Sequence, residues 1–132
     1  MSWIRKLVRH AQERFQRTGA RVVRIFFPPY RTLVVEESLP KKLKRRTLYV
    51  LQEDGFEEQA AMLCPCGCRR VLQMNLLRDE RPYWHLTRHE DDTASLQPSV
   101  WRKKDCGSHF WFRRGRVEWC QGAIEGGVYE AR

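Results

Sequence analysis

The residues of this chain most able to do chemistry are its five cysteines. Three of them lie within the run CPCGC at residues 64–68, and the others are Cys106 and Cys120. Cysteines two residues apart are poorly placed to bridge each other, and the odd number leaves one thiol over, so a disulfide framework is not favoured. We therefore predict that this cluster binds a metal.

The second half of the predicted site is a Cys-x-x-His segment with a glycine inside it, which lets both side chains reach one ion across a tight turn. Structural zinc sites take four ligands, usually thiolates with an occasional imidazole, from two chain segments. The candidate ligands are Cys64, Cys66, Cys68, Cys106 and His109. These are five candidates for four places, so the ligand set stays open. We expect a closed Cys₃His zinc site, with Cys120 as a buried free thiol.

Catalysis is the weaker interpretation of these residues. A catalytic zinc keeps one position open and needs a nearby acid or base, and the nucleobase deaminase signature is absent. A thiol–imidazole pair from Cys106 and His109 would compete with metal binding by the same side chains. His85 and His89 lie near the acidic residues Glu90, Asp91 and Asp92, which suggests a second metal cluster or an acid/base group, but this polar strand-to-loop transition is more typical of a solvated loop. We assign no catalytic residue and keep a zinc-dependent hydrolase as an alternative.

Short β segments must position the ligands. Turn signals separate apolar runs that predict strands at residues 32–35, 47–51, 59–63, 70–76 and 83–87. The clearest hairpin joins residues 109–112 to residues 117–120, with Gly115 as its turn residue. Alternation along the first strand places Phe110 and Phe112 on one face. His109 and Trp111 then lie on the other face.

The first residues look like an appendage to this β-rich part. Apolar residues recur every three or four positions from Trp3 to Phe15, with basic residues between them. The pattern predicts an amphipathic helix that packs on the protein, or alternatively contacts a partner or a membrane surface. We expect a helix within residues 1–29 and a zinc-binding domain over residues 30–132. The expected fold class is α+β, mainly β, and zinc-ribbon-like.

Composition excludes several classes of protein. The 132 residues are 42% hydrophobic and 31% charged, which is too apolar for a disordered chain. No apolar run is long enough for a transmembrane segment, and charges interrupt the N-terminus where a secretory signal would be apolar. A cytoplasmic location is therefore the expectation. The formal net charge of +9 favours an acidic partner of some kind.

Basic and aromatic residues alternate beside the second metal segment. Such a surface can stack single-stranded nucleic acid and contact its phosphates, or it can bind an acidic protein. Both alternatives stay open. The predicted partner-binding residues are Trp111, Arg113, Arg114 and Arg116.

Four sequence segments together resemble a bacterial family of unknown function. They are the CPCGC run at residues 64–68, RPYWHL at 81–86, LQPSV at 96–100, and CGSHFWFRRGRVEWC at 106–120. The resemblance covers about residues 30–120. Members of that family are small metal-binding domains whose gene neighbourhoods encode ubiquitin-like proteins with their E1-, E2- and JAB-peptidase-like enzymes, some tied to phage defence.

The resemblance implies a role in a bacterial ubiquitin-like conjugation pathway. The leading hypothesis is a non-catalytic zinc-stabilised module, an adaptor or E3-like accessory that binds a ubiquitin-like protein or an E1- or E2-like enzyme. A basic nucleic-acid-binding protein is the first alternative. Zn²⁺ would supply folding energy that so small a β domain needs.

Overall fold

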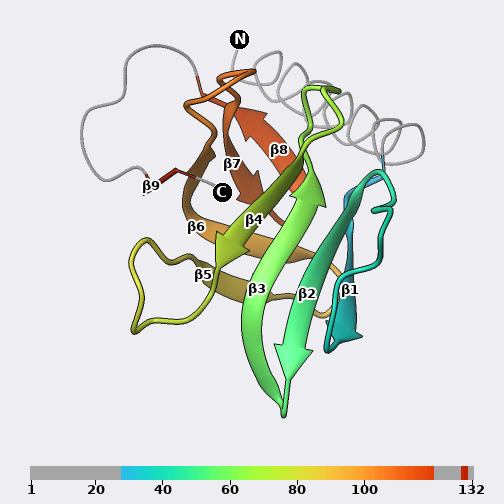
Figure 1. The fold of residues 1–132 in the computed structure, drawn as a ribbon. Helices are drawn as coiled ribbons and strands as arrows, with labels where there is room; N and C mark the ends of the chain where they lie inside the picture. The colour runs from blue at the N-terminus through green and yellow to red at the C-terminus, as the bar shows by residue number, and fades with distance from the viewer. Residues whose placement is uncertain (1–27, 121–128, 131–132) are drawn as a thin grey trace, which may run out of the picture.

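The computed structural model describes residues 28–120 and 129–130, and these residues form two β-sheets (Figure 1). The strands are β1 (Arg31–Glu36), β2 (Thr47–Glu53), β3 (Phe56–Leu63), β4 (Val71–Asn75), β5 (His85–Arg88), β6 (Ala94–Trp101), β7 (His109–Arg113), β8 (Arg116–Trp119) and β9 (Tyr129–Glu130). The first sheet has the order β1-β2-β3-β4. The second has the order β5-β6-β7-β8, and β9 pairs with β6.

The first sheet is antiparallel except at its edge, where β1 runs parallel to β2. Its strands β2 and β3 form a hairpin whose two-residue turn is Asp54-Gly55, and both turn residues have positive φ. That geometry matches the right-handed twist of the paired strands. Strand β3 then continues directly into the cysteine run, so this sheet fixes the starting position of the first metal segment.

The second sheet carries the Cys-x-x-His segment between β6 and β7. These strands pair in register at Leu96 with Phe112 and again at Val100 with Phe110, with an irregularity between the two positions. Three residues of β6 therefore oppose the single residue Trp111, as in an extended bulge. A bulge re-aims side chains, and Ser99 is one of the three residues it contains.

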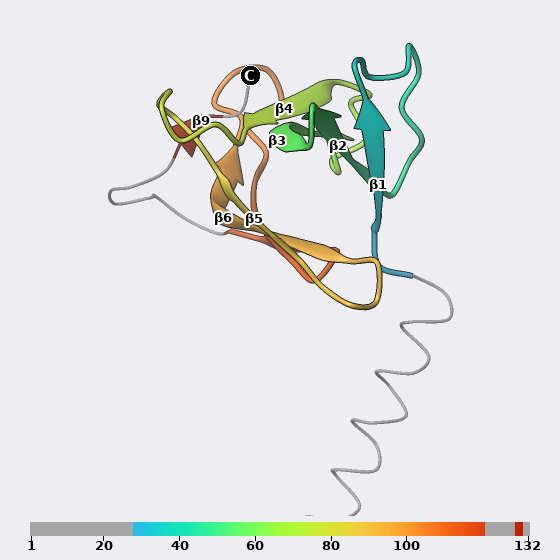
Figure 2. The same ribbon diagram turned by 90° about the horizontal axis from the view of Figure 1, so that it is seen from below.

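The two sheets lie against each other (Figure 2), and residues of both form one hydrophobic core. On β7 the alternation is visible in the burial, because Phe110 and Phe112 are fully buried while His109 and Trp111 are partly exposed. The prediction for the two faces of this strand is confirmed. The core takes residues from both sheets, among them Leu48, Met62, Leu72, Met74, Trp84, Leu96, Val100, Phe110 and Phe112.

The predicted α+β, zinc-ribbon-like fold class was wrong. The described residues are all-β and contain no helix. Their two sheets share an apolar core, whereas a small zinc ribbon is held together mainly by its metal ion. Two short ligand segments had suggested the ribbon, although such segments occur on many scaffolds. The predicted N-terminal helix falls on residues 1–27, which lie outside the described residues. The described part of the chain has no helix long and apolar enough to cross a membrane.

All the strands expected from the sequence are present, within a few residues of their predicted ends. Strand β6 was missed, although it lies in the middle of the second sheet. Proline has no backbone N–H to donate and normally argues against a central strand. Pro98 is tolerated in β6 because it lies within the irregular stretch between Leu96 and Val100, where the ladder to β7 is interrupted.

The turn between β7 and β8 gives a stability prediction. Gly115 has φ of +71°, and a Cβ atom there would lie 2.6 Å from the carbonyl oxygen of Tyr30. Gly55 has φ of +81° in the equivalent turn of the first sheet, and a Cβ atom there would have no other atom within 4 Å. Both Gly→Ala changes should cost about 1 kcal/mol from the positive φ. Gly115→Ala should cost roughly 1–3 kcal/mol more because backbone must move.

Urea unfolding of the two variants and the wild type measures this difference. Equal loss of unfolding free energy in Gly115→Ala and Gly55→Ala would contradict the close packing of the second hairpin on the segment before β1.

Candidate metal centre and serine–histidine pair

The first cysteine segment is a tight loop at the end of β3. Cys64 is buried, and its amide donates to the carbonyl of Arg70, which closes the loop at a distance of 2.8 Å. Gly67 has φ of +91° and donates its N–H to the carbonyl of Cys64 at 3.3 Å. The Cys68 amide also donates to the Cys66 sulfur at 3.4 Å. The glycine therefore lets the chain wrap around its own sulfur atoms.

The second segment lies in the loop between β6 and β7. Arg102 donates its backbone N–H to the carbonyl of Ser108 at 2.8 Å, which brings the two ends of this loop together. Asp105 at its tip accepts from the Arg102 guanidinium at 2.9 Å and lies 3.3 Å from the guanidinium of Arg70. Hydrogen bonding to Arg102 lowers the pKa of the Asp105 carboxyl. Because Arg70 belongs to the first loop, Asp105 links the two loops.

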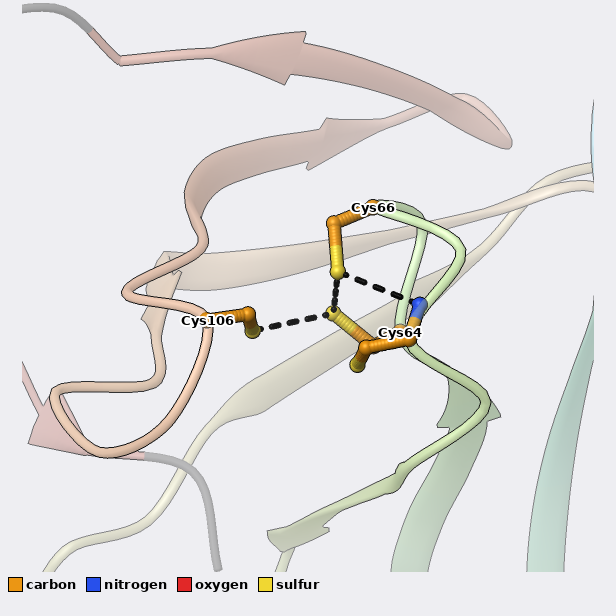
Figure 3. Close-up of side chains that lie close together, drawn as sticks. Cys64, Cys66 and Cys106 are labelled. Carbon is orange, nitrogen blue, oxygen red and sulfur yellow. Dashed lines mark hydrogen bonds between the residues drawn. The ribbon is translucent and has the colours of Figure 1, made fainter.

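Four sulfur atoms from these two loops meet in one cluster. All of them lie within 4.8 Å of one another, and they belong to Cys64, Cys66, Cys68 and Cys106. Figure 3 shows three members of this cluster, Cys64, Cys66 and Cys106, with their side chains close together. The Cys64 sulfur is 3.4 Å from that of Cys66 and 3.6 Å from that of Cys106. Tetrahedral zinc with Zn–S bonds of about 2.3 Å would place its sulfurs about 3.8 Å apart. The donor set and its spacing therefore fit a metal ion.

Ser108 supplies a hydroxyl to this cluster. Its Oγ lies 3.3 Å from the Cys64 sulfur and 3.2 Å from the Cys106 sulfur, and Ser108 is itself buried. Burial raises the pKa of the Cys64 thiol to about 12. Burial also acts to raise the pKa of Cys66, but hydrogen bonds from Ser108 and the neighbouring cysteines outweigh it and lower that pKa to about 6. The thiols thus differ strongly in how readily each releases its proton.

His109 is held by a different partner. Its Nε2 lies 2.8 Å from the Oγ of Ser99, and it is not among the four residues of the sulfur cluster. Ser99 comes from β6 and His109 from the first position of β7, so adjacent strands bring them together. The structure therefore unites four of the five predicted metal ligands and places the fifth in a serine–histidine pair.

The surroundings of this pair favour a neutral imidazole. Burial lowers the pKa of His109, and the ring of Trp101 lies beside it with 5.5 Å between ring centroids. Ser99 is only 2% exposed. Among the described residues, no carboxylate hydrogen-bonds the His109 ring. The pair is a hydroxyl and a base within hydrogen-bonding distance, which is the geometry that activates a serine.

A second serine–histidine pair lies at the other end of β6. The Oγ of Ser95 is 2.8 Å from the Nε2 of His89, and it also accepts the backbone N–H of Arg114 at 2.9 Å. That second bond ties the Ser95 hydroxyl to the β7–β8 turn. Within the described part of the chain, the Ser99 hydroxyl accepts no backbone N–H of this kind. The histidine that it contacts, His109, is three residues from the cluster member Cys106.

The predicted partner-binding residues lie along one side of the second sheet. The guanidinium of Arg113 lies 4.6 Å from the ring centroid of Trp111 and 2.6 Å from a Glu118 carboxylate oxygen. Arg114 and Arg116 line the same cavity as Arg113. Cys120 is partly buried, outside the sulfur cluster, and burial raises the pKa of its thiol.

Sequence reasoning assigned no role to Ser99 or Ser108. Both lie in the segments that carry the family resemblance, LQPSV and CGSHF, but a serine has no spacing signature of its own. The Cys-x-x-His spacing also led to the prediction that His109 is a metal ligand. Only the pairing of β6 with β7 shows that His109 has a hydroxyl beside it.

The sulfur cluster predicts how the chain responds to loss of one thiol. We expect about one metal ion per purified chain, measured by inductively coupled plasma mass spectrometry. Cys106→Ser should weaken metal binding at least about tenfold, because one charged ligand of the set is lost. Cys120→Ser is the matched control and should keep the metal. Equal metal loss in both variants would contradict the four-cysteine cluster.

Comparison with known proteins gives the family. No match was found among curated proteins or among solved structures. A family model described as "Bacterial ubiquitination-like system serine protease (BubE)" matches residues 35–120, a span that contains every described element of the site. The ubiquitin-like context expected from the resemblance is thereby confirmed. Because the match covers well over half of the chain, this protein belongs to the BubE family and is a component of a bacterial ubiquitination-like system.

Proposed function

We propose that this chain is a serine protease in which Ser99 is the nucleophile and His109 is the general base. The observation that carries the proposal is the 2.8 Å separation between the Ser99 Oγ and the His109 Nε2. The description of the matched family supports the same class of reaction. We further propose that the substrate is an amide bond of a ubiquitin-like protein or of one of its conjugates.

The proposed chemistry uses one proton and one covalent intermediate. The Ser99 hydroxyl donates to Nε2, so its proton passes to His109 as the oxygen attacks the carbonyl carbon of the amide. The resulting tetrahedral species collapses when the C–N bond breaks, and the imidazolium gives its proton to the departing amine. Water, deprotonated by His109, then attacks the ester on Ser99 and releases the acid.

The protonation state of His109 suits this role. A base must hold its nitrogen lone pair free at the working pH, and burial lowers the pKa of His109 below that of an ordinary imidazole. The ring is therefore neutral at neutral pH. In the low-dielectric surroundings of Ser99, a neutral pair avoids the cost of a buried charge until the reaction creates one.

The four cysteines are proposed to hold zinc away from the reaction. Cys64, Cys66, Cys68 and Cys106 supply only thiolate sulfur, which is the donor set of closed structural sites. Zinc bound there would supply a cross-link between the two loops. Since His109 directly follows the loop that contains Cys106, that cross-link would fix where β7 begins and therefore the position of His109.

Mutation of the two serines separates catalysis from structure. Ser99→Ala should reduce amide hydrolysis at least about 10³-fold, because it removes the nucleophile. Ser95→Ala is the matched control, with the same distance to its own histidine, and should reduce cleavage by no more than about tenfold, because it removes only the hydroxyl that accepts the Arg114 backbone N–H. The assay incubates each variant with precursor and conjugates of a ubiquitin-like protein from the same gene neighbourhood and follows cleavage by mass spectrometry.

Two outcomes would overturn the proposal. Cleavage that survives Ser99→Ala would assign the reaction to another residue. Absence of cleavage, together with an effect on conjugation that Ser99→Ala preserves, would favour the adaptor role expected from composition and resemblance.

The rate should depend on pH through His109. Protonation of Nε2 blocks acceptance of the serine proton, so activity is present above the pKa of His109 and is lost as pH falls through it. Because that pKa is lowered, the acidic limb of kcat/KM should have its midpoint below the ordinary imidazole value of about 6.5. A midpoint clearly above that value, in a protein that stays folded across the range, would contradict His109 as the base.

A further inference from the structure

Two hollows lie next to each other on the outer side of the second sheet, away from the core. The smaller has a volume of about 350 Å³ and is lined mostly by rings and apolar atoms, among them those of Tyr83, Pro98 and Trp111. The larger has a volume of about 770 Å³ and includes three arginines in its wall. Gln97 lines both, so the two hollows adjoin.

The smaller hollow begins beside the serine–histidine pair. Pro98 directly precedes Ser99 on β6, and Trp111 lies two residues beyond His109 on the same face of β7. At about 3.4 Å per residue, that face advances by about 7 Å from the imidazole to the indole. A substrate extended along these strands would place a side chain about two residues from the reacting bond in this aromatic hollow.

The larger hollow is two further residues along the same strand, at Arg113. Its wall carries Arg113, Arg114 and Arg116 against the carboxylates of Asp91 and Glu118. Glu118 is paired with Arg113 at 2.6 Å. Three arginines and two carboxylates give this wall a net charge of one positive unit. The backbone N–H of Arg114 donates to the Ser95 hydroxyl, and this hydrogen bond fixes the backbone from which the Arg114 side chain extends.

A contact between Arg113 and Trp111 also links the two hollows. The Arg113 guanidinium lies over the Trp111 ring at 4.6 Å from its centroid, so the ring that walls the apolar hollow supports a cation of the charged one. A ligand that filled one hollow would therefore meet an organised surface at the other.

We propose that this double hollow is the substrate-binding surface and that it selects an extended peptide segment with a large apolar residue about two positions from the reacting bond and an acidic residue about four positions from it. This inference rests on the proposed protease function for the identity of the reacting bond. The acidic side chain meets the arginines, and the apolar side chain lies against Trp111 and Pro98.

Binding to the full-length Ser99→Ala variant tests the surface without requiring turnover. The probes are fluorescein-labelled peptides of Gly and Ser that carry one Leu and, two to three positions away, two Asp residues, made in both orders along the chain. Matched probes carry Lys in place of Asp, or Gly in place of Leu. Fluorescence anisotropy at about 0.15 M salt limits attraction to surface charges beyond roughly 8 Å.

The Asp probe should bind at least about tenfold more tightly than the Lys probe, since a charge-assisted contact is gained in one and a repulsion in the other. Adding Arg114→Glu should remove or invert that preference, and adding Trp111→Ala should remove the preference for Leu over Gly. Lys41→Glu makes the same change in net charge on the loop before β2 and should preserve both preferences.

Equal binding of the Asp and Lys probes would overturn the proposal, as would equal effects of Arg114→Glu and Lys41→Glu. Circular dichroism confirms that each variant is folded. Failure of the protease function has a different signature: the Ser99→Ala variant binds the Asp probe selectively, but the wild type never cleaves it or the ubiquitin-like protein.

Discussion

The contact between the sulfur atoms of Cys64 and Cys106 is the interaction on which the site depends. It joins the end of β3 in the first sheet to the loop before β7 in the second. Apolar burial fixes the two sheets against each other, but the loops themselves are polar and largely exposed, so burial does little to hold them. Four thiolates this close together would need a cation to offset their repulsion, so this cluster could hold a metal ion.

The sulfur cluster and the serine–histidine pair therefore occupy separate places in the fold. The cysteines lie at one end of the sheets, where four sulfur donors would fill the positions of a tetrahedral metal ion and leave none for a reacting water. The Ser99 hydroxyl and the His109 imidazole lie on the outer face of β6 and β7. There the irregular stretch from Leu96 to Val100 turns Ser99 toward His109. In the proposed mechanism, the metal segment would affect the reaction by positioning His109, which is only three residues from Cys106.

The parts of the fold that the sequence predicts are those with local signals. Alternation gave the two faces of β7, and a glycine gave the turn after it. Spacing gave the sulfur cluster, since CPCGC has few other uses. Strand β6 was hidden because Pro98 argues against a central strand, and only the interrupted ladder explains its presence. The parallel pairing of β1 with β2 is likewise non-local and has no signature in either strand.

The serine–histidine pair was hidden for a related reason. Ser99 and His109 are ten residues apart, and their contact depends on the register of two strands and on the bulge between them. His109 also satisfied the spacing of a zinc ligand, so a local pattern competed with a tertiary one. Nothing in the types or order of the residues alone decides between these roles.

Ser99 is nearly inaccessible, so the central claim is tested most directly by asking whether an electrophile reaches its hydroxyl. A fluorophosphonate probe reacts with activated serines by forming a P–O bond and releasing fluoride. Peptide mapping by mass spectrometry should find a single adduct, on Ser99, that disappears when His109 is replaced by alanine. An adduct on Ser95, or no adduct in protein that cleaves its substrate, would contradict the assignment of Ser99 and His109.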